Sequence, residues 1–422
     1  MTEPEVPSRR LRAFAHAAGR AGPAGVSRSW QRLLREGFPI IESARGERGS
    51  SLVTFVWRPD RSVTAPSLYT PVAEAIEGMA ELLPLGVGGV WYRSLTLSNR
   101  TRAMYGFSPI SSLRPGSGLK TFLRYIRTVG PDPLNSEQIF FPKDPDDPSD
   151  RAGTRSVVQL PKAPPQPWTR AHGPWRGTEE HRHLPSRNLR GRHSVWVFLP
   201  PRFNSRGAPY NLLIAFDGIA YRDTVPAPTI VQNLVDAGRI SPTVVVLVGN
   251  APGARTQELN RNPAFARYLA RVLLPWLRRR YGLRTTASRT VLAGSSLGAV
   301  AAVDTALRYP KLFGNVLAQS GAFQWFGREL GGPPTSLMQE YVRAPKLPLR
   351  FYLDAGTQEA KVTGKMPLSL LGSVRHLRDV LEAKGYPVAY AEFDGGHDYA
   401  CWRGTLADGI LLLLGRPRRR RP

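Results

Sequence analysis

From residue 191 onward, apolar segments of strand length alternate with amphipathic segments of helix length, and this alternation constrains the fold more than any other feature. The expected strands are residues 194–199, 211–216, 243–248, 290–292, 315–319, 349–353 and 388–393. Each is apolar almost without interruption, which is typical of strands that helices cover on both faces. Since alternating strands and helices form largely parallel sheets, this half of the chain is predicted to be an α/β domain.

Residues 263–281 are predicted to form one of the helices between these strands. Asn262 is suited to cap its first turn, and Pro263 fits the first helical position, where a backbone N–H is not needed. Apolar side chains recur at intervals of mostly three and four residues, at Phe265, Leu269, Val272, Leu273 and Trp276. This spacing places them on one face of the helix.

The first half of the chain shows a different pattern. In residues 28–165, short β-like segments such as 52–57 are separated by turns rich in proline and aspartate, which favours a smaller β-sandwich-like domain. Residues 1–27 are expected to be a flexible basic arm. Residues 166–190, rich in Pro, Arg, Gly and His, are expected to be a linker. The α/β domain then spans 191–417, and residues 418–422 form a basic tail.

The net charge of +26, from 58 Lys and Arg against 32 Asp and Glu, is unusual. Most of the positive residues are arginines scattered along the chain, which favours general solubility, composition drift or an anionic substrate over nucleic acid. No apolar run is long enough for a membrane helix, and the N-terminus lacks the apolar region of a secretory signal. With a single cysteine there is no internal disulfide, so a cytoplasmic location is predicted.

A candidate nucleophile lies at the junction of a strand and a helix. Residues 294–298 read Gly-Ser-Ser-Leu-Gly, a G-x-S-x-G sequence followed by a helical stretch. A serine on such a tight turn projects above the sheet, and the flanking glycines permit the close backbone contacts of the turn. The pattern predicts Ser296 as the nucleophile and the N–H of Leu297 as an oxyanion donor. Because the pentapeptide alone is common by chance, its position between a strand and a helix carries the prediction.

A base and an orienting acid are expected further along the chain. His397 follows the last expected strand, after two glycines, where a hydrolase places its last triad member. The acid should lie between the serine and the histidine, and two carboxylates follow the strand at 349–353. Asp354 lies at the strand end and Glu359 in the loop beyond it. Glu359 is the predicted acid, while Asp354, or a Ser–His pair without a strong acid, stays open.

Three further features have competing interpretations. The loop after the strand at 211–216 offers the N–H of Ile219 as a second oxyanion donor, and an ordinary turn explains the sequence there equally well. His181 and His183 could bind a metal ion, but a solvated polar stretch is the favoured interpretation and no metal site is predicted. Cys401 has no strand-to-helix turn of its own and is predicted to be a buried structural thiol.

These motifs, together with residues of the first half, resemble the enterochelin (enterobactin) esterases, which cleave the ester bonds of ferric catecholate siderophores. The resemblance extends from about residue 37 to residue 415. In the first half it rests on residues 37–42, 53–58, 90–91, 102, 105, 132–135 and 160–167. In the second half it rests on residues 217–218, 255, 258–259, 294–298, 319–321, 325, 395–398 and 401–404.

This resemblance implies an α/β-hydrolase domain beside a β-sandwich-like domain, the serine and histidine above as the catalytic pair, and release of iron in the cytoplasm. It also gives the positive charge a use, because a ferric tris-catecholate is trianionic. Arg255 and Arg403 are the expected cationic contacts, and Trp325 and Trp402 the expected aromatic surface, with ordinary packing and ion pairing as the alternative. Iron would arrive bound to the substrate, so no cofactor is expected.

The predicted reaction is hydrolysis of the trilactone esters of a small ferric siderophore through an acyl-enzyme, with neither nucleic acid nor membrane as partner. One alternative is an acyltransferase, in which an alcohol replaces water, or an esterase for another substrate. A second alternative is a non-catalytic protein that binds an anionic ligand. The sequence leaves open which siderophore is used, whether iron must be bound, and the oligomeric state.

Overall fold

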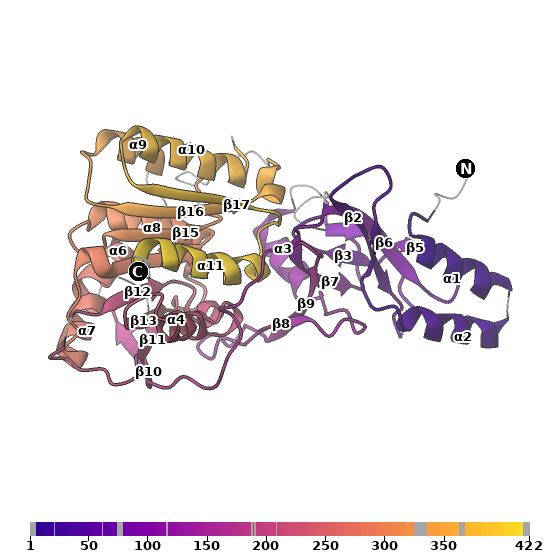
Figure 1. Ribbon diagram of the computed structural model, residues 1–422, viewed down its shortest axis with the longest axis horizontal. Coiled ribbons are helices and arrows are strands. Elements are labelled where there is room, and N and C mark those ends of the chain that lie inside the picture. Colours follow the sequence, from indigo (N-terminus) through magenta and orange to yellow (C-terminus); the bar gives the residue numbers. More distant parts are fainter. Residues whose placement is uncertain are drawn as a thin grey trace, which may run out of the picture. The chain divides into compact units, whose positions relative to one another are not determined.

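The computed structural model describes residues 6–20, 22–60, 62–73, 79–114, 117–186, 189, 191–207, 209–324, 336–362 and 368–416. The chain forms two compact units, which Figure 1 shows with the elements labelled. The N-terminal unit comprises Met1–Phe140, Gly153–Pro164 and Asp394–Ala400. The C-terminal unit comprises Phe141–Ala152, Pro165–Phe393 and Cys401–Pro422. The N-terminal unit therefore includes one short segment, Asp394–Ala400, that lies far from the rest of it in sequence.

The C-terminal unit is built on one sheet with the strand order β10-β11-β13-β12-β14-β15-β16-β17. The strands are β10 (Thr178–Pro185), β11 (Arg192–Leu199), β12 (Asn211–Ala215), β13 (Thr243–Val248), β14 (Thr290–Ser295), β15 (Asn315–Gln319), β16 (Arg350–Gly356) and β17 (Val388–Phe393). From β12 to β17 all pairs are parallel, while β11 is antiparallel to both β10 and β13. The prediction of an α/β domain is confirmed.

Helices cover both faces of this sheet. They are α4 (Ala227–Asp236), α5 (Arg255–Leu259), α6 (Pro263–Tyr268), α7 (Leu274–Tyr281), α8 (Leu297–Arg308), α9 (Leu337–Arg343), α10 (Leu370–Ala383) and α11 (Tyr399–Leu414). Val316 of β15 belongs to the core shared with α8 and α10. Its neighbour Leu317 points to the opposite face, where a Cβ on Gly409 of α11 would lie 2.7 Å from it. In Figure 1, α11 accordingly crosses in front of the strands.

The predicted helix at 263–281 is present but not uniform. The Asn262 side chain accepts a hydrogen bond from the N–H of Ala264 at 2.8 Å, which confirms the predicted cap. A π-helical turn, Leu269–Leu273, separates α6 from α7. Pro275 offers no N–H to the carbonyl of Arg271, so regular α-helical bonding is lost at this point and the backbone widens into the π turn.

The N-terminal unit contains two sheets, with strand orders β1-β2-β6-β5 and β4-β3-β7-β9-β8. The strands are β1 (Ile40–Ser43), β2 (Ser50–Trp57), β3 (Ser67–Tyr69), β4 (Met79–Glu81), β5 (Leu83–Pro84), β6 (Trp91–Ser98), β7 (Arg102–Ser108), β8 (Gln138–Phe141) and β9 (Gly153–Gln159), with helix α3 (Gly118–Ile126) between β7 and β8. Val53 and Phe55 of β2 share a core with Tyr105 and Phe107 of β7. The two sheets therefore face each other, as expected of a β-sandwich.

The expectation of a flexible arm at residues 1–27 is wrong for the described part of that segment. Helices α1 (Arg9–Arg20) and α2 (Pro23–Leu34) form a hairpin there. Leu11 and Phe14 of α1 are buried against Trp30 and Leu33 of α2. The arginines dominate the composition of α1, but its apolar side chains at intervals of three and four residues form a stripe that packing stabilises.

The expectation of a linker at residues 166–190 is also wrong in part, because β10 lies within it. This strand pairs with β11 along its whole length, from Thr178 opposite Leu199 to Pro185 opposite Arg192. It is an edge strand, and most of its side chains are partly or fully exposed. A polar edge strand lacks the continuous apolar run that marks a buried strand, which is why composition alone suggested a linker.

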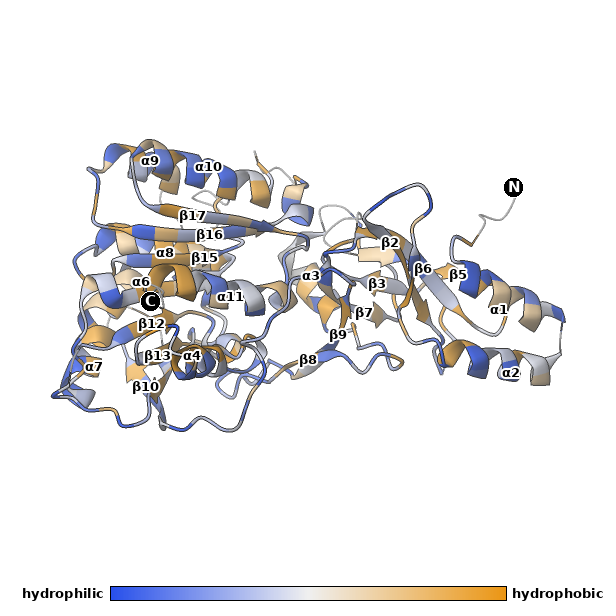
Figure 2. Cartoon of the chain, viewed as in Figure 1, coloured by the Kyte–Doolittle hydropathy of each residue, from blue (hydrophilic) through white to orange (hydrophobic). Residues whose placement is uncertain are grey.

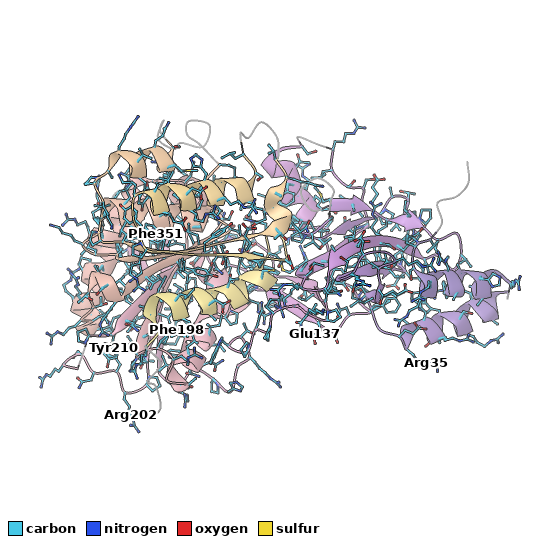
Figure 3. The ribbon with its side chains drawn as sticks, turned by 45° about the horizontal axis from the view of Figure 1, so that its top comes forward. Arg35, Glu137, Phe198, Arg202, Tyr210 and Phe351 are labelled. Carbon is cyan, nitrogen blue, oxygen red and sulfur yellow. The ribbon has the colours of Figure 1, made fainter. Side chains whose placement is uncertain are left out.

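Hydropathy follows this architecture. Figure 2 shows hydrophobic residues gathered on the inner strands and hydrophilic residues on the outer helix faces and loops. In Figure 3, Phe198 and Phe351 lie within the C-terminal unit and Arg202 lies at its surface. Among the residues that the structure describes, none of the helices is both long enough and apolar enough to cross a membrane.

Candidate active site

Ser296 occupies the sharp turn between β14 and α8. Its backbone has φ 56° and ψ −122°, a left-handed conformation that residues other than glycine rarely adopt. The N–H of Ser296 donates to the carbonyl of Gln319 at 3.0 Å, and its carbonyl accepts from the N–H of Ala322 at 3.2 Å. These bonds hold the strained turn, and the serine side chain is only partly buried. The predicted strand-to-helix turn is confirmed.

The close contacts expected of this turn are also present. A Cβ on Gly294 would lie 2.6 Å from the carbonyl carbon of Gly298, so only glycine fits at that position. Leu297 is the first residue of α8. Its N–H therefore lies at the positive end of a twelve-residue helix, where a developing negative charge is stabilised.

The loop after β12 lies beside this turn. A Cβ on Gly298 would be 3.4 Å from Oδ2 of Asp217, and β12 pairs with β14 in parallel. Asp217 has φ 52°, and a Cβ on Gly218 would lie 2.9 Å from the backbone N of Gly249. Ile219 follows directly and is partly exposed. Both candidate oxyanion donors thus come from neighbouring strand ends.

Arg255, predicted as a substrate contact, makes a two-pronged ion pair with Asp217. Its Nε donates to Oδ1 at 2.5 Å and its Nη2 to Oδ2 at 2.8 Å. Since the guanidinium fork matches the carboxylate, this pair fixes the start of the loop that carries Ile219. The structure therefore gives Arg255 a role in holding the loop, as the alternative of ion pairing anticipated.

His397 lies on the loop between β17 and α11. It is partly buried, and the segment Asp394–Ala400, which comprises this loop and the first two residues of α11, belongs to the N-terminal unit. The next residue, Asp398, is completely buried. Its Oδ1 accepts the N–H of Ala400 at 2.7 Å and its Oδ2 accepts the N–H of Met104 at 2.5 Å. Burial raises the pKa of Asp398 to about 7, although both N–H bonds favour its charged form.

The two candidate acids lie in different surroundings. Asp354 is the fifth residue of β16, completely buried, and its Oδ1 accepts the N–H of Ser320 at 3.1 Å. Burial raises the pKa of Asp354 to about 8. Glu359 lies beyond the strand on a short 3₁₀ turn, Thr357–Ala360, and accepts the N–H of Gly356 at 2.6 Å. Asp354 is thus part of the sheet interior, whereas Glu359 is in the following loop, as predicted.

The burial of Asp354 predicts a pH effect on stability. Its carboxyl stays protonated in the folded chain up to pH about 8 but ionises near pH 4 when unfolded. Between these values the unfolded chain binds fewer protons, so the free energy of unfolding falls as pH rises. The Asp354→Asn variant has no carboxyl to ionise. As pH rises from 5 to 7.5, the free energy of unfolding of the wild type should therefore fall by on the order of 2–3 kcal/mol relative to that of the variant. Urea unfolding measures this, and parallel pH curves for the two proteins would contradict it.

The remaining predicted contacts differ in outcome. Trp402 as an aromatic surface for substrate is wrong, since the side chain is 2% exposed and its Nε1 donates to Ser320 Oγ at 3.0 Å. It is buried because α11 packs against the sheet. Arg403 is partly buried on the same helix, and its role stays a prediction. Trp325 lies outside the described residues. Cys401 is buried, which confirms the structural thiol.

Among the residues that the structure describes, one group of side chains could hold a metal ion. Ligand atoms of Asp146, His181 and His183 all lie within 4.8 Å of one another. His183 Nε2 is 2.9 Å from Asp146 Oδ1, and His181 Nε2 is 2.9 Å from Ser194 Oγ. The ring of His181 also stacks on Trp196 at 4.6 Å between centroids. Every one of these ligands has a protein partner, so hydrogen bonding and stacking account for the cluster.

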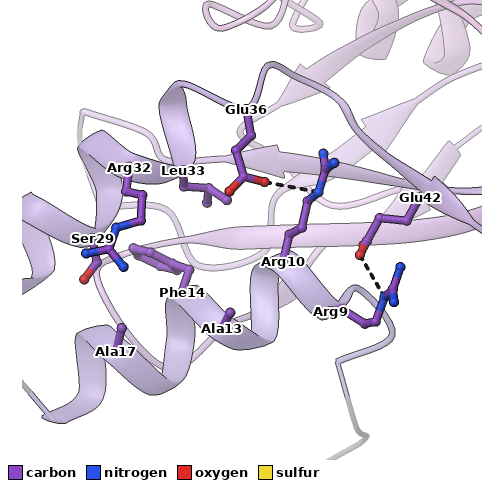
Figure 4. A pocket seen from close by; sticks show the side chains of 10 residues that line it. All are labelled: Arg9, Arg10, Ala13, Phe14, Ala17, Ser29, Arg32, Leu33, Glu36 and Glu42. Atoms are coloured by element: carbon purple, nitrogen blue, oxygen red, sulfur yellow. Dashed lines mark ion pairs between the residues drawn. The ribbon is translucent and has the colours of Figure 1, made fainter.

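The N-terminal unit has a pocket of about 330 Å³ between α1 and α2 (Figure 4). Two of its arginines are ion-paired, Arg10 with Glu36 at 3.1 Å and Arg9 with Glu42 at 3.6 Å. None of the predicted site residues lines this pocket. These ion pairs connect α1 to the residues just after α2 and to β1. The charged groups of the pocket therefore contribute to the packing of the N-terminal unit.

Asp217 and Asp398 were not predicted to have roles. Asp217 lies two residues before Ile219, in the motif D-G, and Asp398 directly follows His397, in the motif G-G-H-D. Their partners, Arg255 and Met104, are 38 and 294 residues away. A carboxylate close to a candidate site residue was the available signal, but sequence spacing does not reveal partners so far away in the chain.

Comparison with known proteins agrees with this architecture. Residues 186–413 match the family model of the esterases, and residues 52–169 match the model described as enterochelin esterase, N-terminal. An iron(III) enterobactin esterase of Dickeya dadantii is 26% identical over 434 residues, covering 93% of each chain. An iron(III) salmochelin esterase of Escherichia coli O6:H1 is 29% identical over 415 residues, covering 93% of this chain and 94% of the relative.

A solved structure extends the likeness to the whole fold. The ferric enterobactin esterase of Salmonella typhimurium superposes with a TM-score of 0.73 and 26% identity, over 92% of this chain and 98% of that one. The esterase model alone matches more than half of the chain. The prediction of an α/β-hydrolase domain together with a sandwich domain is therefore confirmed, and the chain belongs to the enterochelin esterase family of carboxylic ester hydrolases.

Proposed function

We propose that this chain is a serine esterase that hydrolyses the trilactone esters of a ferric catecholate siderophore of the enterobactin type. The observation that carries the proposal is the strained turn at Ser296, in a chain that aligns over nearly its whole length with iron(III) enterobactin esterases. A nucleophilic serine in this fold needs this geometry. The substrate class is inferred from the relatives.

In the proposed mechanism, His397 takes the proton from Ser296 as the hydroxyl oxygen attacks the ester carbonyl. The N–H groups of Leu297 and Ile219 hold the oxyanion, and the alcohol leaves with a proton from the imidazole. Water activated by His397 then hydrolyses the acyl-enzyme. Glu359 orients the imidazole and stabilises its protonated form.

Sheet geometry supports the pairing of the serine with the histidine. β14 and β17 belong to one parallel run, so their carboxyl ends lie at the same edge, three strand positions apart. That separation is roughly 14 Å at about 4.8 Å per strand. His397 comes four residues after β17 ends, and four extended residues span at most about 14 Å. At full extension the chain between β17 and His397 would just match this separation, and the side chains of Ser296 and His397 shorten the distance that the backbone must cover.

Charge favours the same substrate class. A net charge of +26 attracts a trianionic complex, with Arg403 as a proposed contact. Iron enters with the substrate, so we propose no resident cofactor, and neither nucleic acid nor a membrane as partner. A single cysteine in 422 residues fits a reducing compartment, and we propose the cytoplasm as the place of iron release.

The test is product analysis with a ferric and an iron-free triscatechol trilactone. We expect linear trimer, dimer and monomer to appear in sequence, since repeated turnover opens one ester at a time. Addition of an alcohol acceptor distinguishes acyl transfer, which would yield a new ester. Binding of the lactone without any cleavage would instead favour the non-catalytic alternative and overturn the proposal.

A further inference from the structure

The loop that carries His397 is held by the sandwich rather than by its own helix and strand alone. It leaves β17 at Phe393 and enters α11 at Tyr399. Asp394–Ala400 nevertheless groups with the N-terminal unit. The contacts responsible are distributed along the whole loop.

At the start of the loop, Asp394 is bound by two residues around the β6–β7 turn. Its Oδ2 accepts a hydrogen bond from Ser98 Oγ at 2.9 Å and lies 3.4 Å from Nε of Arg100. In the middle, Gly396 lies directly against the backbone of Pro71. A Cβ at this position would overlap the Pro71 carbonyl oxygen, so the approach requires glycine.

At the end of the loop, Asp398 binds β7 through the backbone. Its two oxygens accept one N–H from Met104 and one from Ala400, and no exposed surface remains on the residue. The bond to Met104 uses a main-chain donor of a buried strand, which cannot move without disturbing the sheet. His397 therefore lies between two anchored neighbours, Gly396 and Asp398.

We propose that the sandwich domain positions the general base, and that Asp398 is the positioning residue through which β7 fixes the backbone of His397. This inference rests on the proposed role of His397 and adds a second task to the N-terminal domain. The N-terminal domain would then be required for the hydrolysis of every ester substrate, including esters that make no contact with this domain.

Asp398→Asn is the test variant. Asparagine keeps one acceptor oxygen but turns the other into an NH₂ group, which cannot accept an N–H. One of the two bonds is lost, and the histidine shifts. Because misplacement of a catalytic group by about 1 Å costs up to about 100-fold, we expect kcat to fall by about 10- to 100-fold with KM nearly unchanged.

Thr54→Val is the matched control. Thr54 is completely buried in β2 of the same unit, and its hydroxyl forms a hydrogen bond with Ser94 Oγ at 2.8 Å. Neither side chain is among the loop contacts described above. This variant should lose about 2–4 °C in melting temperature and retain the wild-type kcat. If Asp398→Asn fails to fold, Ser98→Ala with Arg100→Ala releases the other end of the loop, with an expected fall in kcat of about 2- to 5-fold.

A double-mutant cycle separates positioning from general damage. In the His397→Ala background, Asp398→Asn should cause no further loss, because its effect acts only through the imidazole. Rates are measured with a nitrophenyl ester and by fluorophosphonate labelling of Ser296, both independent of the siderophore. A wild type that reacts with these probes but not with the lactone defeats the proposed substrate alone. An equal loss in both backgrounds, or an unchanged kcat in folded Asp398→Asn, overturns the positioning role.

Discussion

Replacing Ser296 by alanine is expected to lower kcat/KM for ester hydrolysis by about 10,000-fold or more, since no acyl-enzyme can form and only binding and the oxyanion donors remain. The backbone of this turn is already strained at φ 56°, and alanine can adopt it about as well as serine. The variant should therefore fold normally and bind substrate. Initial rates of lactone opening and labelling by a fluorophosphonate probe measure the effect.

Ser295→Ala is the matched control for this experiment. Ser295 is the last residue of β14, pairs with Gln319 in the sheet and is 1% exposed. Because Ser295 is buried, its hydroxyl is inaccessible to a substrate from solvent, so activity and probe labelling should stay within about twofold of the wild type. Full activity in Ser296→Ala, or loss of labelling only in Ser295→Ala, would remove the proposed nucleophile.

The sequence predicted those parts of the fold in which composition and burial coincide. The strands β13 and β15 have the predicted bounds because strands covered on both faces are continuous apolar runs. β17, a partly exposed edge strand, also has its predicted bounds. It failed for α1, whose arginines obscure a narrow buried stripe, and for β10, whose side chains face outward at an edge. In both cases tertiary partners stabilise an element that local composition does not mark.

The candidate site shows the same division. Ser296 could be located because the turn requires glycines at fixed offsets, which a local pattern reveals. Trp402 was expected on the surface and is buried, because the direction of an aromatic side chain depends on what its helix packs against. The anchoring of Asp398 to Met104 joins residues nearly 300 positions apart. Rules based on the spacing of residues in a motif cannot predict a contact between residues so far apart in the sequence.

Glu359→Gln is expected to lower kcat by about 100- to 10,000-fold, the range in which removal of the carboxylate beside a catalytic histidine acts. The reason for choosing Glu359 over Asp354 is electrostatic. With a pKa of about 8, the buried carboxyl of Asp354 is mostly protonated at pH 7 and carries no charge to stabilise an imidazolium. Glu359 lies just past the end of β16, and β16 is the neighbour of β17 in the sheet.

Asp354→Asn serves as the control in the same assay, since its amide oxygen can still accept the N–H of Ser320 and a neutral group replaces a neutral group. At pH 7 its kcat should stay within about fivefold of the wild type, because the backbone at the carboxyl ends of β15 and β16 keeps its conformation. The two variants are compared by steady-state kinetics on one ester. A larger loss in Asp354→Asn than in Glu359→Gln would reverse the assignment, and small losses in both would mean that His397 works without a carboxylate partner.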